Sequence, residues 1–153
     1  MYCRSRYTEF SYTWGNDPPS VVQIPQRDSE LATFEIDHSV VVSNVGKRAS
    51  PVVVLAFIVA TADSPQDTPI KKLFGFERLA NVLPGQNATV RFTSDAASMG
   101  VVGATGAKLL LAGRYRIEIG SVSAPAACEV ELSGGSAIVE ENKWAAAMAN
   151  QWQ

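Results

Sequence analysis

Hydrophobic and polar residues alternate along several segments of this chain. The alternation is clear from Phe34 to Val42, from Gly113 to Gly120 and from Cys128 to Ser133. Because successive side chains of a strand point to opposite faces of a sheet, each segment is predicted to be a strand with one buried face. The segment from Val52 to Ala60 is apolar at every position. It is therefore predicted to be a central strand that is covered on both faces.

Turn-forming residues separate these segments. Three prolines between Gly15 and Glu30 exclude a helix, so this stretch is expected to be a loop or an edge. The small, glycine-rich stretch 94–108 is expected to be a long connection. About seven strands result, with turn signals roughly every 8 to 12 residues. The pattern predicts an all-β fold, an antiparallel β-sandwich of the immunoglobulin or fibronectin type III type.

Three parts of the chain are distinguished on this basis. Residues 1–30 are expected to hold a lead-in strand, which includes Tyr7, Phe10 and Tyr12, and the proline-rich loop. Residues 31–135 are expected to form the sandwich. In the extension 136–153, Trp144, Met148 and Trp152 recur every four residues among alanines, which predicts an amphipathic helix. The helix is expected to dock on its own domain or on a missing neighbour.

The segment from Pro69 to Phe92 carries the most information. Pro84 and Gly85 predict a turn, after which Val90 and Phe92 return to the strand period. Leu73 and Phe76 lie three residues apart, so a regular strand would point them to opposite faces. A bulge at Gly75 is expected to bring both side chains into the core. Phe76→Ala is then expected to cost about 3 to 5 kcal/mol of stability.

The net charge and the length of the longest apolar segment bear on whether the chain binds nucleic acid or a membrane. The formal net charge is −2 and no basic stripe is visible, so a nucleic-acid partner or an anionic membrane surface is not expected. The longest apolar run, 52–60, is too short for a membrane helix, which needs roughly 20 residues.

Two features bear on the cellular compartment. Asn87-Ala88-Thr89 is an N-glycosylation sequon directly after the predicted turn, and Asn87 is the candidate acceptor. If the sequon is used, the protein is secreted through a signal that lies elsewhere; the alternative is a chance tripeptide. Cys3 and Cys128 form a disulfide if the first and last strands are adjacent. Otherwise Cys128 is a small buried hydrophobe and Cys3 is free.

Few residues suggest chemistry. His38 shares the buried parity of its strand and has no partner cluster in the sequence, so it is interpreted as a core or rim residue. Asp63 and Asp67 are the best carboxylate pair, but a polar loop offers no burial to raise the pKa of a general acid. No metal cluster or phosphate-binding loop is visible. No catalytic residue, metal site or cofactor is therefore predicted.

The order of residues in 69–92 resembles the hallmark of the fibronectin type III-like domain that closes many family 3 glycoside hydrolases. The resemblance extends over roughly Tyr7 to Leu132, and its spacing is most similar to that of eukaryotic β-xylosidase-like members. Ser50 and Ala112 depart from the family pattern, in place of a glycine and a proline. The residues that carry the resemblance most clearly are Lys71, Leu73, Gly75, Phe76, Arg78, Pro84, Gly85, Gly113 and Tyr115.

The resemblance implies a non-catalytic accessory domain, because the family's catalytic residues lie in other domains that this chain lacks. Its partners would be the catalytic domains of a secreted, extracellular or vacuolar glycosidase that hydrolyses β-xylosides or β-glucosides. The alternative is a free-standing module that binds carbohydrate or protein. Such a module needs exposed aromatic side chains, for which the candidates are Trp14, Trp144 and Trp152. An independent small enzyme is the least favoured interpretation.

Overall fold

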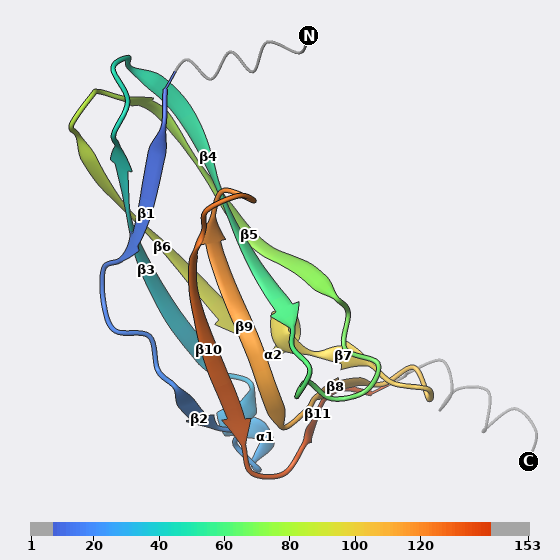
Figure 1. Cartoon of the computed structure of the whole chain (residues 1–153). Helices are drawn as coiled ribbons and strands as arrows, with labels where there is room; N and C mark the ends of the chain where they lie inside the picture. The colour runs from blue at the N-terminus through green and yellow to red at the C-terminus, as the bar shows by residue number, and fades with distance from the viewer. Residues whose placement is uncertain (1–7, 142–153) are drawn as a thin grey trace, which may run out of the picture.

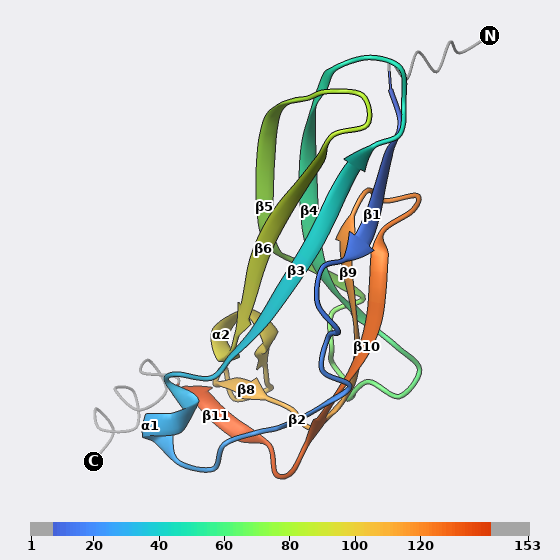
Figure 2. The ribbon, with the colours of Figure 1, turned by 90° about the vertical axis from the view of Figure 1, so that its left-hand side faces the viewer.

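The structure, a computed structural model, describes residues 8–141, and most of it is formed by two packed β-sheets. A three-stranded sheet has the order β1-β3-β6, and a five-stranded sheet has the order β2-β10-β9-β4-β5. Figures 1 and 2 show the two sheets from two directions. The strands of five or more residues are β1 (Phe10–Trp14), β3 (Glu35–Asn44), β4 (Ser50–Ala60), β5 (Lys71–Val82), β6 (Asn87–Asp95), β9 (Gly113–Gly120) and β10 (Ala126–Ser133).

These seven longer strands confirm the predicted all-β sandwich. The pairs among them are antiparallel, and the short edge strand β2 (Val21–Gln23) adds to β10 in parallel. The proline-rich stretch is therefore an edge, as one of the two expectations had it. The expectation that this stretch holds no helix is wrong for its last three residues, which begin the short helix α1 (Asp28–Leu31) that leads into β3. The helix starts beyond Pro25, the last proline of the stretch, so no proline interrupts it.

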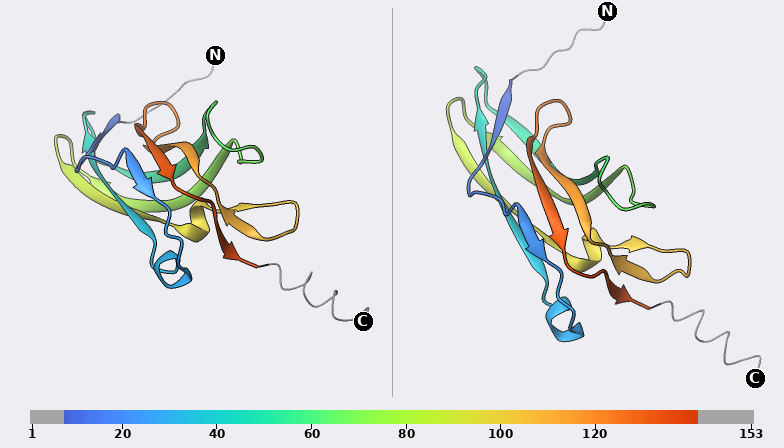
Figure 3. Two further views of the ribbon diagram at one scale, coloured as in Figure 1. Left: turned by 90° about the horizontal axis from the view of Figure 1, so that it is seen from below. Right: turned by 60° about the horizontal axis from the view of Figure 1, so that its bottom comes forward.

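A third, small sheet lies at the end of the sandwich where the described chain ends (Figure 3). It is formed by β7 (Val101–Val102), β8 (Lys108–Leu110) and β11 (Ala137–Glu140), and α2 (Ala96–Met99) precedes it. The expected long connection 94–108 is thus partly ordered into a helix and a hairpin. The expected helix over 136–153 is wrong for Ala137–Glu140, because these residues pair with β8. Residues 142–153, with both predicted helix tryptophans, lie outside the described residues.

The core lies between the two large sheets and is made by the predicted strand faces. In β3 the buried residues are Ile36, His38, Val40 and Val42, all on one parity. In β9 they include Tyr115, Ile117 and Ile119, again on one parity. Each fully buried aliphatic side chain of this kind contributes about 1.5 to 3 kcal/mol through removal of apolar surface from water. The alternation in the sequence therefore located the core faces of these strands correctly.

The expectation that β4 is covered on both faces is wrong. Val54, Ala56 and Ile58 point into the core and are at most 4% exposed, whereas Val53 on the opposite face is 49% exposed. Leu55 also lies on that outer face and is only half-buried. The reason is that no layer of the described chain packs outside the five-stranded sheet.

A β-bulge interrupts the pairing of β5 with β4. Ala56 pairs with Gly75 and Phe57 pairs with Leu73, so Phe74 is the extra residue. The bulge brings Leu73 and Phe76 to one face, as expected, but that face is the outer one. Leu73 is 48% and Phe76 is 69% exposed, so the placement of both side chains in the core is wrong.

Phe74 takes the core place that was expected for Phe76. Its ring centre lies 6.4 Å from that of Phe92 and 5.8 Å from that of His38. Gly75 also faces inward, and a Cβ there would lie 2.8 Å from the Phe92 ring. A larger residue at position 75 would therefore push the ring of Phe92 aside.

A buried asparagine, Asn44, holds three segments of the chain together at one end of the sandwich. The Asn44 amide nitrogen donates to the carbonyl oxygens of Arg48 and Val82, both at 2.8 Å. Its amide oxygen accepts from the Gly46 backbone at 3.0 Å and from the Thr8 hydroxyl at 2.6 Å. These bonds satisfy a polar group that is 1% exposed. The start of β1, the β3–β4 turn and the end of β5 are held together in this way.

The predicted turn before β6 is confirmed. The Gln86 amide donates to the Leu83 carbonyl at 2.9 Å, and Gly85 has a φ of 75°. A proline followed by a residue with positive φ is the signature of a type II turn, and glycine adopts that φ without steric cost. Pro84 and Gly85 therefore fix the turn by which the chain passes from β5 in the five-stranded sheet to β6 in the three-stranded sheet.

Truncation should destabilise the domain at Phe74 and have almost no effect at Phe76. Phe74→Ala should lower the free energy of unfolding by about 2 to 4 kcal/mol, because it opens a cavity beside Phe92. Phe76→Ala should change it by less than about 0.5 kcal/mol, because the ring is on the surface. Urea unfolding of both variants and the unaltered chain measures the difference. A larger loss for Phe76→Ala would show that the register of β5 is wrong.

Candidate functional site

The outer face of β4 and β5 carries a continuous row of apolar side chains. Opposite residues in an antiparallel pair share a face, and here Phe76 lies opposite Leu55 and Leu73 lies opposite Phe57. Val53 continues the row at one end, where it is paired with Arg78. We call these five apolar residues the outer strip: Val53, Leu55, Phe57, Leu73 and Phe76.

Charged residues border the outer strip toward β9. Lys71 Nζ lies 2.9 Å from a carboxylate oxygen of Glu118, and Arg116 Nε lies 3.0 Å from the other. The hydrogen bond from Lys71 is the main reason that the pKa of Glu118 is lowered, so this carboxylate is ionised near neutral pH. Lys71 Nζ also lies 4.4 Å from the centre of the Phe57 ring, which it partly covers. The strip is therefore apolar in its middle and charged along this side.

The nine residues that carry the family resemblance divide into two groups in the structure. Four lie in β5 and are exposed, namely Lys71, Leu73, Phe76 and Arg78. The other five shape the backbone or the core, namely Gly75, Pro84, Gly85, Gly113 and Tyr115. Sequence reasoning did not separate the two groups and did not identify Val53, Leu55 and Phe57 as surface residues. The sequence feature that could have indicated such a surface is the run of apolar residues on both faces of β4.

Two of the structural residues fix the start of β9. Gly113 has a φ of 152°, and a Cβ there would lie 2.7 Å from Pro65. Tyr115 is 1% exposed, and its hydroxyl donates to the Leu111 carbonyl at 2.8 Å. Burial raises the pKa of Tyr115 to about 12, so the hydroxyl stays protonated. Both residues therefore serve the scaffold.

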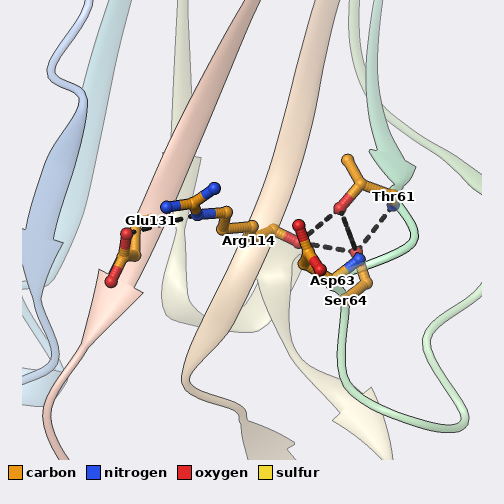
Figure 4. Close-up of polar contacts among 5 residues, drawn as sticks. All are labelled: Thr61, Asp63, Ser64, Arg114 and Glu131. Atoms are coloured by element: carbon orange, nitrogen blue, oxygen red, sulfur yellow. Dashed lines mark hydrogen bonds and ion pairs between the residues drawn. The ribbon is translucent and has the colours of Figure 1, made fainter.

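Asp63 and Asp67, the carboxylate pair singled out in the sequence, lie at the surface. Both are exposed in the loop between β4 and β5. The contacts of Asp63 in Figure 4 run through its backbone, whose carbonyl accepts from the Arg114 amide at 3.4 Å and whose amide donates to Thr61 Oγ1 at 3.3 Å. Ser64 Oγ donates to the Arg114 carbonyl at 2.6 Å. The loop is thus fastened to β9, and neither aspartate has the buried setting of a general acid.

The Arg114 side chain turns away from this loop. Its Nε lies 3.3 Å from a carboxylate oxygen of Glu131, an exposed ion pair that adds little to stability (Figure 4). Among residues 8–141, no group of three or more His, Cys, Asp and Glu side chains could hold a metal ion. Within the same range, no helix is long and apolar enough to cross a membrane.

His38 lies in the core, 2% exposed, in agreement with its interpretation as a core residue. Its Nε2 shares a 2.9 Å hydrogen bond with Ser94 Oγ, and its Nδ1 has no hydrogen-bond partner. Burial lowers the pKa of His38, while the charge of Asp37 acts weakly in the opposite direction. The ring lies between the rings of Trp14 and Phe74, so it is part of the core and faces no cluster of reactive groups.

The remaining candidates are placed as follows. Trp14 is partly buried and donates from Nε1 to the Ala127 carbonyl at 3.2 Å, so it is not a flat exposed platform for a sugar ring. Asn87 and Thr89 are exposed at the start of β6, where a glycan could be attached. Cys128 is partly buried, and burial raises the pKa of its thiol to about 11. Cys3 lies outside the described residues, so the two alternatives, a disulfide to Cys128 or two unpaired cysteines, both stay predictions.

The fold and the comparison with known families agree on the class of this domain. Residues 52–123 match the fibronectin type III-like domain family. The chain is 29% identical over 116 residues to a probable exo-1,4-beta-xylosidase of Aspergillus terreus, covering 74% of this chain and 15% of that protein. It is 34% identical over 89 residues to another from Aspergillus flavus, covering 58% of this chain and 10% of that protein.

Solved structures of two glycosidases contain the same fold. A GH3 exo-beta-xylosidase in complex with a xylobiose aziridine probe matches 88% of this chain and 18% of its own, with 23% identity and a TM-score of 0.74. The beta-glucosidase of Kluyveromyces marxianus in complex with glucose matches 88% of this chain and 15% of its own, with 22% identity and a TM-score of 0.67.

The chain therefore contains a fibronectin type III-like domain. More particularly, this domain is related to the one in the C-terminal region of family 3 glycoside hydrolases. The chain spans less than a fifth of the length of these relatives.

The buried histidine should make stability depend on pH. The folded-state pKa of His38 is lowered by burial below the ordinary value of about 6.5, so the unfolded chain binds the proton more tightly. As the pH falls below about 6.5, the free energy of unfolding should decrease by up to about 1.4 kcal/mol per pH unit from this group.

Because His38 is the sole histidine, His38→Gln isolates its contribution. The free energy of unfolding of both proteins is measured with urea between about pH 7 and 5. The carboxylates titrate in both proteins, so the difference between the two curves reports His38. The loss on acidification should be steeper for the unaltered chain. Parallel curves would show that His38 is not kept neutral by the fold.

Proposed function

We propose that this chain is a non-catalytic accessory domain of a family 3 glycoside hydrolase and that it stabilises the catalytic domains by packing against them. The observation that carries the proposal is the size of the match. Nearly three quarters of this chain corresponds to only 15% of a probable exo-1,4-beta-xylosidase. The remaining part of that enzyme is available to hold the catalytic groups, with this domain as a neighbour.

The distribution of carboxylates supports a non-catalytic role. Glycoside hydrolysis by the usual mechanism needs two carboxyl groups about 5 to 9.5 Å apart across the bond, one of them protonated. Glu118 is ionised by its two cationic neighbours. The pKa of Asp95 is lowered mainly by the hydrogen bond from Ser98 at the start of α2. Neither group has the raised pKa of a general acid.

The relatives also suggest the substrate of the parent enzyme. They are probable exo-1,4-beta-xylosidases by sequence, and the structural neighbours include beta-glucosidases. We therefore expect the catalytic domains, in the same polypeptide or in a partner, to hydrolyse β-xylosides or β-glucosides. The exposed sequon at Asn87 is in keeping with a secreted or vacuolar glycoprotein.

The purified chain should not hydrolyse glycosides. With 4-nitrophenyl β-xyloside and β-glucoside, its rate should equal that of the buffer blank. An Asp63→Asn, Asp67→Asn double variant provides the control for contaminating activity. Turnover that persists through repurification and is lost in the double variant would contradict the accessory role.

Asn87 should carry an N-linked glycan when the chain is directed through the secretory pathway of a yeast host. Removal of N-glycans with an amidase should then lower the mass by one glycan, and Asn87→Gln should have the same low mass without treatment. Thr89→Ser, which keeps the sequon, provides the matched control. An unmodified secreted chain would show that the sequon is a chance tripeptide.

A further inference from the structure

The outer strip of β4 and β5 is an apolar surface without a covering layer among the described residues. Phe76, Val53 and Leu73 are 69%, 49% and 48% exposed, and they lie on neighbouring strands. Monomeric proteins rarely expose contiguous apolar patches of this kind unless the patch has a binding role. Scattered single residues would need no explanation, but these side chains are cross-strand neighbours.

We propose that the outer strip is the surface by which this domain docks on a catalytic domain of its parent glycosidase, with Phe76 as the central anchor. The inference rests on the proposed function and adds the place of contact. The occupant is a protein surface with an apolar depression for Phe76 and an acidic side chain opposite Arg78. Arg78 lies at the end of the strip beside Val53, and no ion-pair partner for it is present among residues 8–141.

The pattern of polarity fits a protein partner. An apolar centre with charged residues along its border is the usual arrangement of a protein interface. On the β9 side Lys71 and Arg116 share the single carboxylate of Glu118, whereas Arg78 on the other side has no ion-pair partner among residues 8–141. Charges across an interface are usually complementary, so we expect the partner surface to place an acidic side chain opposite Arg78.

Two alternative occupants are less well matched. Strand addition by a second copy would use the free edge of β5, but the bulge at Phe74 and two neighbouring lysines, Lys71 and Lys72, disfavour pairing there. A polysaccharide would need flat aromatic faces. Among residues 8–141 the only aromatic side chain with large exposure is Phe76, and the Phe57 ring is partly covered by Lys71.

The greater length of the relatives indicates which protein surface covers the outer strip. The chain covers 18% of a GH3 exo-beta-xylosidase of known structure and 15% of the Aspergillus terreus protein. In such proteins the domain is tethered to a much larger body. The tether makes docking intramolecular, so that a strip of this modest width is enough to hold the domain in place.

The test uses the Aspergillus terreus enzyme with its matching region replaced by this chain. Its activity half-life during heating is compared with that of the enzyme lacking the region. Phe76→Ser should shorten the half-life of the chimera at least about fivefold, because loss of one interface anchor releases the domain. Phe76→Leu should retain most of the half-life. Val122→Ser, at a 75% exposed position in the β9–β10 turn, provides the matched control and should have little effect.

The same Phe76→Ser substitution should hardly change the melting temperature of the isolated 153-residue chain, because the side chain is exposed there. One outcome is a chimera that is more heat-resistant than the shortened enzyme but is affected equally by Phe76→Ser and Val122→Ser. That outcome would overturn the proposed docking surface and leave the accessory function intact. A chimera no more resistant than the shortened enzyme would overturn both. An isolated chain that is dimeric by light scattering, and monomeric as Phe76→Ser, would show that a second copy is the occupant.

Discussion

The register of β5 on β4 is the constraint on which the arrangement of this domain depends. One extra residue, Phe74, is accommodated between two consecutive cross-strand pairs. Since side chains alternate between faces, this insertion changes the face of the residues that follow it, as far as a second register shift between Leu79 and Val82. Phe74 is placed against Phe92 in the core, and Leu73 and Phe76 both face outward. Gly75 makes this possible, because the ring of Phe92 lies where a side chain at position 75 would begin.

The parts of the fold that depend on local pattern were predictable. The alternation from Phe34 to Val42 and from Tyr115 to Ile119 gave the correct strands and the correct buried faces. The bulge near Gly75 was also foreseen. Its consequence for Phe76 was not, because the face that a bulged strand presents is decided by its pairing with β4, far away in sequence. The two- to four-residue strands of the third sheet likewise exist only through long-range pairing.

The apolar run of β4 shows what a sequence pattern leaves open. Apolar residues on both faces of β4 indicate that both faces are shielded from water. The pattern does not show whether this domain or another protein covers each face. Val54 and Ala56 are covered by the opposite sheet of this domain, whereas Val53 and Leu55 are not. A strand that is hydrophobic on both sides, in a domain with only two layers, therefore suggests an interface as readily as a central position.

The rigid setting of the outer strip is what suits it to binding. The β4–β5 hairpin is held at one end by the buried Asn44 amide, which bonds the Val82 carbonyl, and toward its other end by the Lys71–Glu118 ion pair. Side chains fixed on paired strands lose little conformational freedom when a partner covers them, so more of the buried apolar area is available as binding free energy. Because such a partner would bind the folded sandwich and not the unfolded chain, docking would also stabilise the domain that docks. The stabilisation that an accessory domain gives its enzyme is on this account mutual.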